Sequence, residues 1–281
     1  MPQPAALIAR IRLVHPFPSL LNGFAVLGIA WIAGGAPATV LRLALAMILI
    51  QFTIGATNDL ADAARDADRT PAKPIAAGLI APRSAAAAAW MFGILGLALA
   101  GLSGLITLAI ALAGLACGLV YNAALSRSAL SWLPLTLALP LVPAFAWYGA
   151  VGSLPSGIAQ VVPIAMVAGA GLAIGNGLVD LDVDGPRGRR TAAVALGRVA
   201  AWTVHAAALT AATAAAWILL PSGGGASAAG LLVAGALTVL AGVFGLATRS
   251  GARFRLAWAL EAGGIMLIGL AWVLAAGTGP R

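Results

Sequence analysis

Seven of the eight acidic residues in this 281-residue chain lie in two short clusters. The clusters share one spacing, an asparagine followed at four-residue intervals by two aspartates: Asn58, Asp62 and Asp66 in the first, and Asn176, Asp180 and Asp184 in the second. On a helix, residues four apart are neighbours on one face, with about 5–6 Å between their Cβ atoms. Carboxylates stacked in this way repel one another unless a cation lies between them. Mg²⁺ suits that place, because it binds through one or two carboxylates together with substrate phosphates.

Three further acids belong to the same clusters. Asp59, next to Asn58, is a candidate metal ligand, and the sequence assigns no function to Asp68. Asp182 is expected to point away from Asp180 on a continuous helix, and would reach a metal only where the helix unwinds. The alternative is that both clusters are helix ends carrying solvated acids. The helix dipole disfavours that reading, because acids are destabilising at a helix C-terminus.

Basic residues follow each acidic cluster and supply candidate ligands for an anion: Arg69 and Lys73 after the first, and Arg189 and Arg190 after the second. Guanidinium and ammonium groups beside metal-binding acids form a site suited to a diphosphate. Each of these basic residues also has an alternative explanation, because positive charge in the cytoplasmic loops of membrane proteins sets their topology.

The composition places these clusters in a membrane protein. Hydrophobic residues make up 62% of the chain and charged residues only 9%, against about 25% charged in a typical soluble domain, which excludes a soluble enzyme. A helix needs about 20 apolar residues to cross a bilayer. Nine segments meet this requirement: 19–35, 39–57, 84–101, 104–121, 131–149, 159–179, 199–220, 226–246 and 256–276. We therefore predict one all-α integral membrane domain of nine transmembrane helices over residues 1–281.

The distribution of basic residues predicts the orientation of these helices. All 16 lysines and arginines except Arg42 and Arg281 lie in the N-terminal segment or in loops that follow an even-numbered span. Cytoplasmic loops carry such an excess, so we expect a cytoplasmic N-terminus and a C-terminus on the opposite side. No basic run is interleaved with aromatic residues, as nucleic-acid binding requires, so the bilayer rather than a nucleic acid is the expected partner.

The repetition of the acidic motif predicts internal symmetry. The two motifs end the second and the sixth predicted spans, a shift of four helices. The first four and the next four helices are therefore predicted to be related repeats, with the ninth helix added. The two polar faces are expected to meet at a central cavity that opens on the cytoplasmic side.

Three isolated titratable residues lie outside the clusters. His205 is expected to be a packing residue inside the seventh span, and His15 to lie at the interface or to assist acceptor binding. Glu261, the one acid outside the clusters, is expected to pair with Arg255 or to lie at the cytoplasmic interface.

The sequence resembles the UbiA superfamily of intramembrane prenyltransferases. The similarity rests on NDLADAARD with the following RTPAKPIAAG, on GLVYNAALSR after the fourth span, and on VDLDVDGPRGRRTAAVALGR. The nine predicted spans and their topology agree with the family. The chain departs from it at His15-Pro16, where many members carry Arg-Pro.

The resemblance implies an enzyme that uses Mg²⁺ and an isoprenyl diphosphate. By similarity, the catalytic residues would be Asp62, Asp180 and Tyr121, with Tyr121 over the reactive allylic carbon. The metal ligands would come from Asn58, Asp59, Asp62, Asp66, Asn176, Asp180 and Asp184. The basic residues that would contact substrate are Arg69, Lys73, Arg127, Arg189 and Arg190.

Four functions remain open on the sequence alone. The first is transfer of the isoprenyl group to an aromatic or other small lipophilic acceptor in the membrane. A terpene cyclase on the same scaffold would share the ionisation step and need no acceptor. The PIAAG run also resembles the family branch that transfers phosphoribosyl groups to polyprenyl phosphate. A transporter is the non-enzymatic alternative, although transporters place such acids near the bilayer midplane. Prenyl chain length and oligomeric state are not readable from the sequence.

Overall fold

The computed structural model of the chain describes residues 3–64, 73–247 and 251–277, and these residues form helices without a strand. In chain order the α-helices are α1 (Gln3–Leu13), α2 (Pro16–Ile32), α3 (Pro37–Asp62), α4 (Pro82–Gly101), α5 (Leu105–Val120), α6 (Leu133–Ala138), α7 (Leu141–Val151), α8 (Ile158–Val179), α9 (Leu181–Asp184), α10 (Ala192–Leu196), α11 (Arg198–Ile218), α12 (Gly225–Ala247) and α13 (Gly251–Gly277). A π-helical turn, η1 (Tyr121–Leu125), extends α5.

The prediction of an all-α membrane protein is confirmed. In the described residues, eight segments are long and apolar enough to cross a bilayer. The 17-residue α2 meets the same requirement only together with Leu7–Leu13 of α1, and the two helices are bent by 59°, so this pair is a candidate for the ninth span. The bend falls at His15, whose φ of 47° lies in the left-handed region that non-glycine residues rarely adopt.

Proline and glycine set most of the boundaries of these spans. A proline occupies one of the first two helical positions of α2, α3 and α4, where its missing N–H costs no hydrogen bond. The third and fourth spans form a tight hairpin, because α4 ends at Gly101 and α5 begins at Leu105. The fifth span is broken into α6 and α7 next to Pro140, whereas α8 continues through Pro163.

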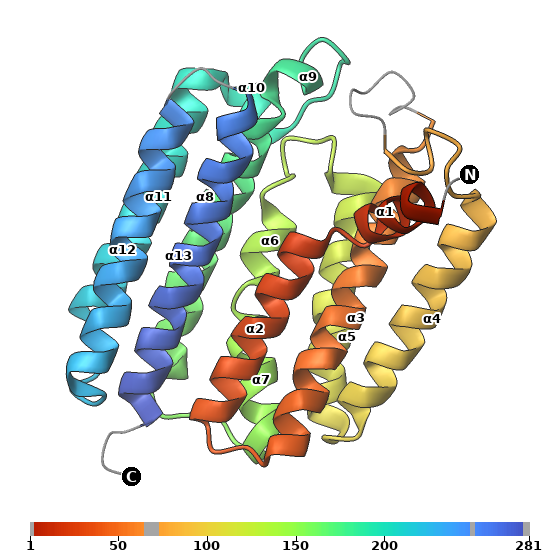
Figure 1. Cartoon of the computed structure of the whole chain (residues 1–281). Coiled ribbons are helices and arrows are strands. Elements are labelled where there is room, and N and C mark those ends of the chain that lie inside the picture. Colours follow the sequence, from red (N-terminus) through yellow and green to blue (C-terminus); the bar gives the residue numbers. More distant parts are fainter. Residues whose placement is uncertain (1–2, 65–72, 248–250, 278–281) are drawn as a thin grey trace.

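The core consists of two main packing clusters. One joins α2, α3 and α7, with Leu43 and Phe145 at its centre, and the other joins α8, α11, α12 and α13 around Leu209 and Leu232. The two groups of helices stand side by side in Figure 1. A cavity described below lies between them. Large apolar side chains such as Trp90 and Ile218 are exposed on the outside of the bundle, as expected for a surface that faces lipid.

His205 and Glu261 form a buried polar pair inside the second group of helices. Both side chains are 0% exposed, and His205 Nε2 lies 2.9 Å from Glu261 Oε1. His205 Nδ1 lies 2.8 Å from the carbonyl oxygen of Gly171, so Nδ1–H is the donor there. The pair therefore connects α8, α11 and α13. The prediction of a packing role for His205 agrees with this arrangement.

The prediction for Glu261 is wrong, because it neither pairs with Arg255 nor lies at the interface. Gly242 of α12 packs directly against the Glu261 side chain, which lets α12 and α13 approach closely enough to bury the acid. With Nδ1–H committed to Gly171, the pair holds one shared proton, either as His⁺ with carboxylate or as neutral His with carboxylic acid. Both arrangements are electrically neutral, so the pair avoids the free-energy cost of burying an unpaired charge in the apolar bundle.

We expect Glu261→Leu to lower the thermal unfolding temperature in detergent, corresponding to a loss of about 1–3 kcal/mol, because it leaves the His205 ring nitrogen buried without its partner. The matched variant Glu261→Gln keeps a hydrogen-bonding group at the same place and is expected to lose much less. Scanning fluorimetry of both variants checks this, and equal unfolding temperatures for the two would contradict it.

Candidate active site

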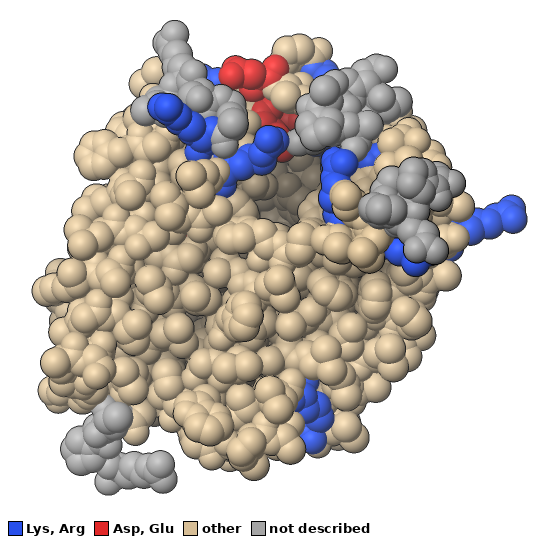
Figure 2. All heavy atoms as spheres, viewed as in Figure 1, with Lys and Arg blue, Asp and Glu red and all other residues tan. Residues whose placement is uncertain are grey.

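Charged side chains collect at one end of the bundle, here named the charged end and defined by Asp62, Arg127, Asp180, Asp184 and Arg189. Figure 2 shows acidic and basic side chains gathered at the top of the molecule over a hollow, on a face that is otherwise almost free of charge. α3, α5 with η1, and α8 all end there. Because these helices run the length of the bundle, residues distant in the sequence meet at one place.

Asn58 is held in a network that involves three elements. Its Nδ2 donates to Asn122 Oδ1 of η1 at 3.1 Å, and its Oδ1 accepts from Lys73 Nζ at 3.2 Å. Asn122 Nδ2 in turn donates to the Ile54 carbonyl and to Thr57 Oγ1, both at 2.9 Å. The Asn58 side chain is thereby fixed with its carbonyl oxygen facing the basic residue that follows the first motif.

Asp59 points to a different set of partners from the other acids of the first motif. It is 1% exposed, and its Oδ1 lies 3.1 Å from both His15 Nε2 and Lys73 Nζ. His15 belongs to the bend between α1 and α2. Asp59 therefore connects that bend and Lys73 to α3. This contact with Asp59 accounts for the position of His15.

Asp62 and Asp184 connect the two acidic motifs through one guanidinium group. Arg189 NH2 lies 3.5 Å from Asp62 Oδ2, and Arg189 Nε lies 3.5 Å from Asp184 Oδ1. Asp62 also has Arg127 NH2 at 3.6 Å and Lys73 Nζ at 3.8 Å. Asp62 and Asp184 are each at most 5% exposed. In such a buried cluster the carboxylates can bind a metal in place of the basic side chains, and the basic side chains can then bind an anionic ligand.

The second motif does not lie on one continuous helix, which corrects the sequence prediction. α8 ends at Val179 and α9 begins at Leu181, with Asp180 between them at φ −101° and ψ 6°. Asp180 lines the cavity. Asp182 points outward as predicted, with an 80% exposed side chain and a 2.6 Å ion pair to Arg198.

Tyr121, predicted from the resemblance, opens the π-helical turn η1 and lines the cavity at its charged end. The extra residue in a π-helical turn changes the direction in which its side chains point, compared with an α-helix, and such turns are frequent at functional sites. Asp184, Asp62 and Asp180 all act electrostatically on the Tyr121 hydroxyl. The aromatic ring thus stands between the acids and the apolar interior.

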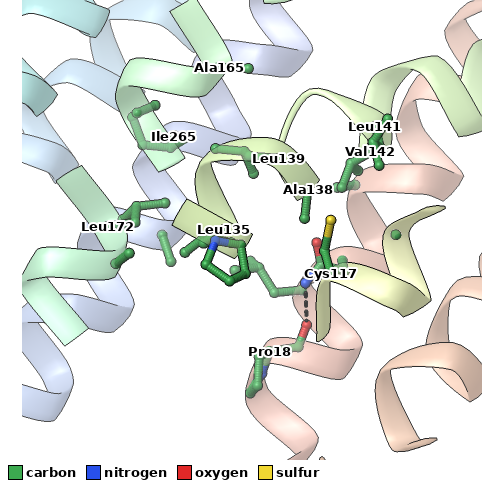
Figure 3. A pocket seen from close by; sticks show the side chains of 18 of the residues that line it. Pro18, Cys117, Leu135, Ala138, Leu139, Leu141, Val142, Ala165, Leu172 and Ile265 are labelled. Carbon is green, nitrogen blue, oxygen red and sulfur yellow. Dashed lines mark hydrogen bonds between the residues drawn. The ribbon is translucent and has the colours of Figure 1, made fainter. Parts of the chain in front are cut away.

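Below the charged end lies a cavity of about 410 Å³. Figure 3 shows its apolar part, with Leu135, Leu139, Leu172 and Ile265 among the labelled side chains. Asn176 of α8 also lines this cavity. A site with charge at one end and hydrocarbon below it can bind an amphipathic ligand with an anionic head and an apolar tail.

Three predicted site residues remain, of which the structure describes only Arg190. Asp66 and Arg69 lie outside the described residues. The Arg190 side chain is exposed, and its backbone N–H donates to the carbonyl of Arg127 at 3.1 Å. Its structural contribution is therefore to join the loop after α9 to the loop after η1.

The oxygen ligands at the charged end fit magnesium. In the described ranges, no three His, Cys, Asp or Glu side chains form a ready metal cluster. Lys73, Arg127 and Arg189 each lie within 4 Å of the Asp62 carboxylate instead. Mg²⁺ commonly uses only one or two protein carboxylates and completes its shell with water and phosphate oxygens. Asp62 with Asn58, and Asp180 with Asp184, each meet that need.

Sequence reasoning missed Asn122, which positions Asn58, and the joint contact of Arg189 with both motifs. Asn122 stands directly after Tyr121 in the run that carries the resemblance, and a polar residue in an otherwise apolar segment was the available signal. Nothing in the sequence spacing indicates that one arginine reaches two acids.

Comparisons with known proteins agree with the fold described above. The model of the UbiA prenyltransferase family matches residues 21–260. A UbiA homolog from Archaeoglobus fulgidus bound to GPP and Mg²⁺ is similar in structure, with a TM-score of 0.73 and 17% identity over 95% of this chain and 99% of that one. For a UbiA homolog from Aeropyrum pernix K1 the TM-score is 0.70 and the identity 23%, over 92% and 97%. No curated protein matches the chain.

The all-helical fold and its long apolar helices define a multi-pass integral membrane protein. The chain belongs to the UbiA prenyltransferase family.

Proposed function

We propose that this protein transfers an isoprenyl group from an isoprenyl diphosphate to an aromatic or other small lipophilic acceptor within the membrane. The observation that supports this most directly is that Arg189 joins Asp62 of the first motif to Asp184 of the second at the polar end of an apolar cavity. The binding of GPP and Mg²⁺ by the Archaeoglobus fulgidus homolog supports the same classes of ligand here.

The metal would be held by Asn58, Asp62, Asp180 and Asp184, with Asn176 and Asp66 as further candidates. When bound, magnesium would neutralise the charge that develops on the departing diphosphate. Asp59 is a further candidate through its Oδ2, which is buried without a hydrogen-bond partner among the described residues, whereas its Oδ1 is held by His15 and Lys73.

The basic residues would bind the diphosphate and stabilise it as it leaves. Lys73, Arg127 and Arg189 already face the carboxylates that a metal would engage, so on metal binding they are free to turn to phosphate oxygens. The bond between the allylic carbon and oxygen would break with its electron pair leaving on the diphosphate. The face of Tyr121 would then stabilise the allylic cation, a contact worth about 0.5–2 kcal/mol.

The orientation in the bilayer follows from the charge. We propose that the charged end is cytoplasmic, because Arg127 and Arg189 belong to the loops in which basic residues gather. The N-terminus would then be cytoplasmic and the C-terminus on the opposite side.

Release of inorganic diphosphate from C10, C15 and C20 isoprenyl diphosphates by the purified protein tests the proposal. We expect release with Mg²⁺, none with excess EDTA, and recovery when Mg²⁺ is restored. Product analysis with and without an acceptor then distinguishes transfer from cyclisation, since a cyclic hydrocarbon formed without acceptor indicates the cyclase. Diphosphate release that persists in EDTA would refute the metal-dependent reaction.

A further inference from the structure

Two amide side chains line the cavity well below its charged end. Asn22 of α2 and Gln51 of α3 both belong to the lining and are half-buried. α2 and α3 run in opposite directions (Figure 1), and Gly23 packs against Ile48. Residues beside this contact therefore lie at similar depths, which places Asn22 and Gln51 within about one helical turn of each other along the bundle axis.

Most of the hydrogen-bonding capacity of these amides is unused. Asn22 Nδ2 donates to the carbonyl of Pro18 at 2.9 Å, the dashed line in Figure 3, and Gln51 Nε2 lies 3.8 Å from Met47 Sδ. Among the described residues, no donor reaches Asn22 Oδ1 or Gln51 Oε1. A ligand that fills the cavity would displace water from these half-buried amides, and a polar group kept from water without a partner is costly. The acceptor oxygens therefore favour a ligand that donates a hydrogen bond.

The rest of the lining restricts the ligand further. Among the described residues that line the cavity, charged side chains occur only at the charged end: Asp180, Asp184 and Arg189. A carboxylate placed beside the two amides would have no cation to pair with, and burial of an unpaired charge is strongly unfavourable. A hydrocarbon chain at the same place would leave both amide oxygens unsatisfied. A neutral hydroxyl group carries no charge, donates a hydrogen bond to one amide oxygen and accepts one from an amide N–H, so it pairs with these side chains where a hydrocarbon cannot.

We propose that Asn22 and Gln51 form an acceptor subsite, which binds a neutral hydroxyl group of a lipophilic acceptor and selects it over carboxylates and hydrocarbons. The inference rests on the proposed function for the identity of the ligand as acceptor. Gln51 precedes Asn58 by seven residues on α3, about 10 Å along the helix axis. The hydroxyl would thus lie about 10 Å from the place where the diphosphate would bind, measured along α3. That distance is about the length of a bicyclic aromatic ring.

The single cysteine provides a reporter for this subsite. Cys117 lines the same cavity and is half-buried. The full chain in nanodiscs is alkylated with N-ethylmaleimide, followed by mass spectrometry, in the presence of 2-naphthol, 2-methoxynaphthalene or 2-naphthoate. We expect 2-naphthol to protect Cys117 at an about tenfold lower concentration than its methyl ether. We expect 2-naphthoate to protect no better than the methyl ether.

Leucine variants test the two amides directly. Asn22→Leu and Gln51→Leu keep the approximate side-chain volume, and the double variant is expected to abolish the tenfold advantage of 2-naphthol over 2-methoxynaphthalene. Gln160→Leu is the matched control, because Gln160 is exposed and lies outside the cavity lining, and it is expected to keep the advantage. Comparing the ratio of the two protecting concentrations between variants cancels differences in membrane partitioning.

Three results would overturn the subsite. They are an undiminished preference for 2-naphthol in the double variant, protection by 2-naphthoate equal to that by 2-naphthol, and no protection of wild-type Cys117 by any of the probes. Neither metal nor diphosphate is needed in this measurement. If the protein released no diphosphate with Mg²⁺ but kept the preference for the hydroxyl probe, the proposed function would be refuted and the subsite would stand. If it released diphosphate but showed no such preference, the subsite would be refuted and the proposed function would stand.

Discussion

Asp62→Asn is expected to reduce magnesium-dependent release of diphosphate about 100- to 1,000-fold, the range found when one preorganised electrostatic group is removed from a site of this kind. Asp62 is the carboxylate on which Lys73, Arg127 and Arg189 converge. The amide keeps the shape of the side chain but removes the charge that a metal requires. Steady-state diphosphate release from an isoprenyl diphosphate at saturating Mg²⁺ measures the effect.

Asp182→Asn is the matched control for this prediction. It makes the same chemical change two residues beyond Asp180, in a side chain that is 80% exposed and paired with Arg198. Its diphosphate release is expected to stay within about twofold of wild type, because surface ion pairs contribute little. If the two variants lost activity equally, the position of Asp62 at the centre of the site would be wrong.

The sequence was sufficient to locate the charged end because charge is expensive in a membrane. An acid in an apolar chain persists only where it is paired or functional, so the clustering of acids already pointed to the place where Asp62 and Asp184 meet. The spans could be predicted for a similar reason, since apolar length is imposed by bilayer thickness. The hairpin at Gly101–Gly104 and the break near Pro140 follow from local chain chemistry.

The partners of individual side chains could not be predicted in the same way. The sequence predicts that Glu261 pairs with Arg255, six residues away, or lies at the cytoplasmic interface, whereas its partner His205 lies 56 residues away on α11. The break at Asp180 likewise replaces the expected continuous helical face. These features depend on how closely helices approach, which small residues such as Gly242 decide and which hydropathy does not record.

Arg189→Gln is expected to change metal affinity and substrate affinity in opposite directions. In the described structure Arg189 neutralises Asp62 and Asp184 at once. Without the guanidinium the two carboxylates repel each other, so the Mg²⁺ concentration for half-maximal activity is expected to fall. The diphosphate loses a charged ligand, and its KM is expected to rise about 10- to 100-fold. Titrating each ligand at saturation of the other measures the two effects separately.

Arg189→Lys distinguishes charge from geometry in this prediction. Lysine keeps the positive charge, but its single ammonium lacks the planar fork with which Nε and NH2 reach two different carboxylates. It is therefore expected to restore part of the diphosphate affinity while pairing with only one of the two carboxylates, so that the Mg²⁺ requirement stays below that of wild type. If Arg189 had only a structural role, its replacement would raise the half-saturating concentrations of Mg²⁺ and diphosphate together, or lower the unfolding temperature without opposite changes in the two. In Arg189→Gln, the half-saturating Mg²⁺ concentration would fall and the KM for the diphosphate would rise. If Arg189→Lys reversed these two shifts only in part, one side chain would serve both motifs.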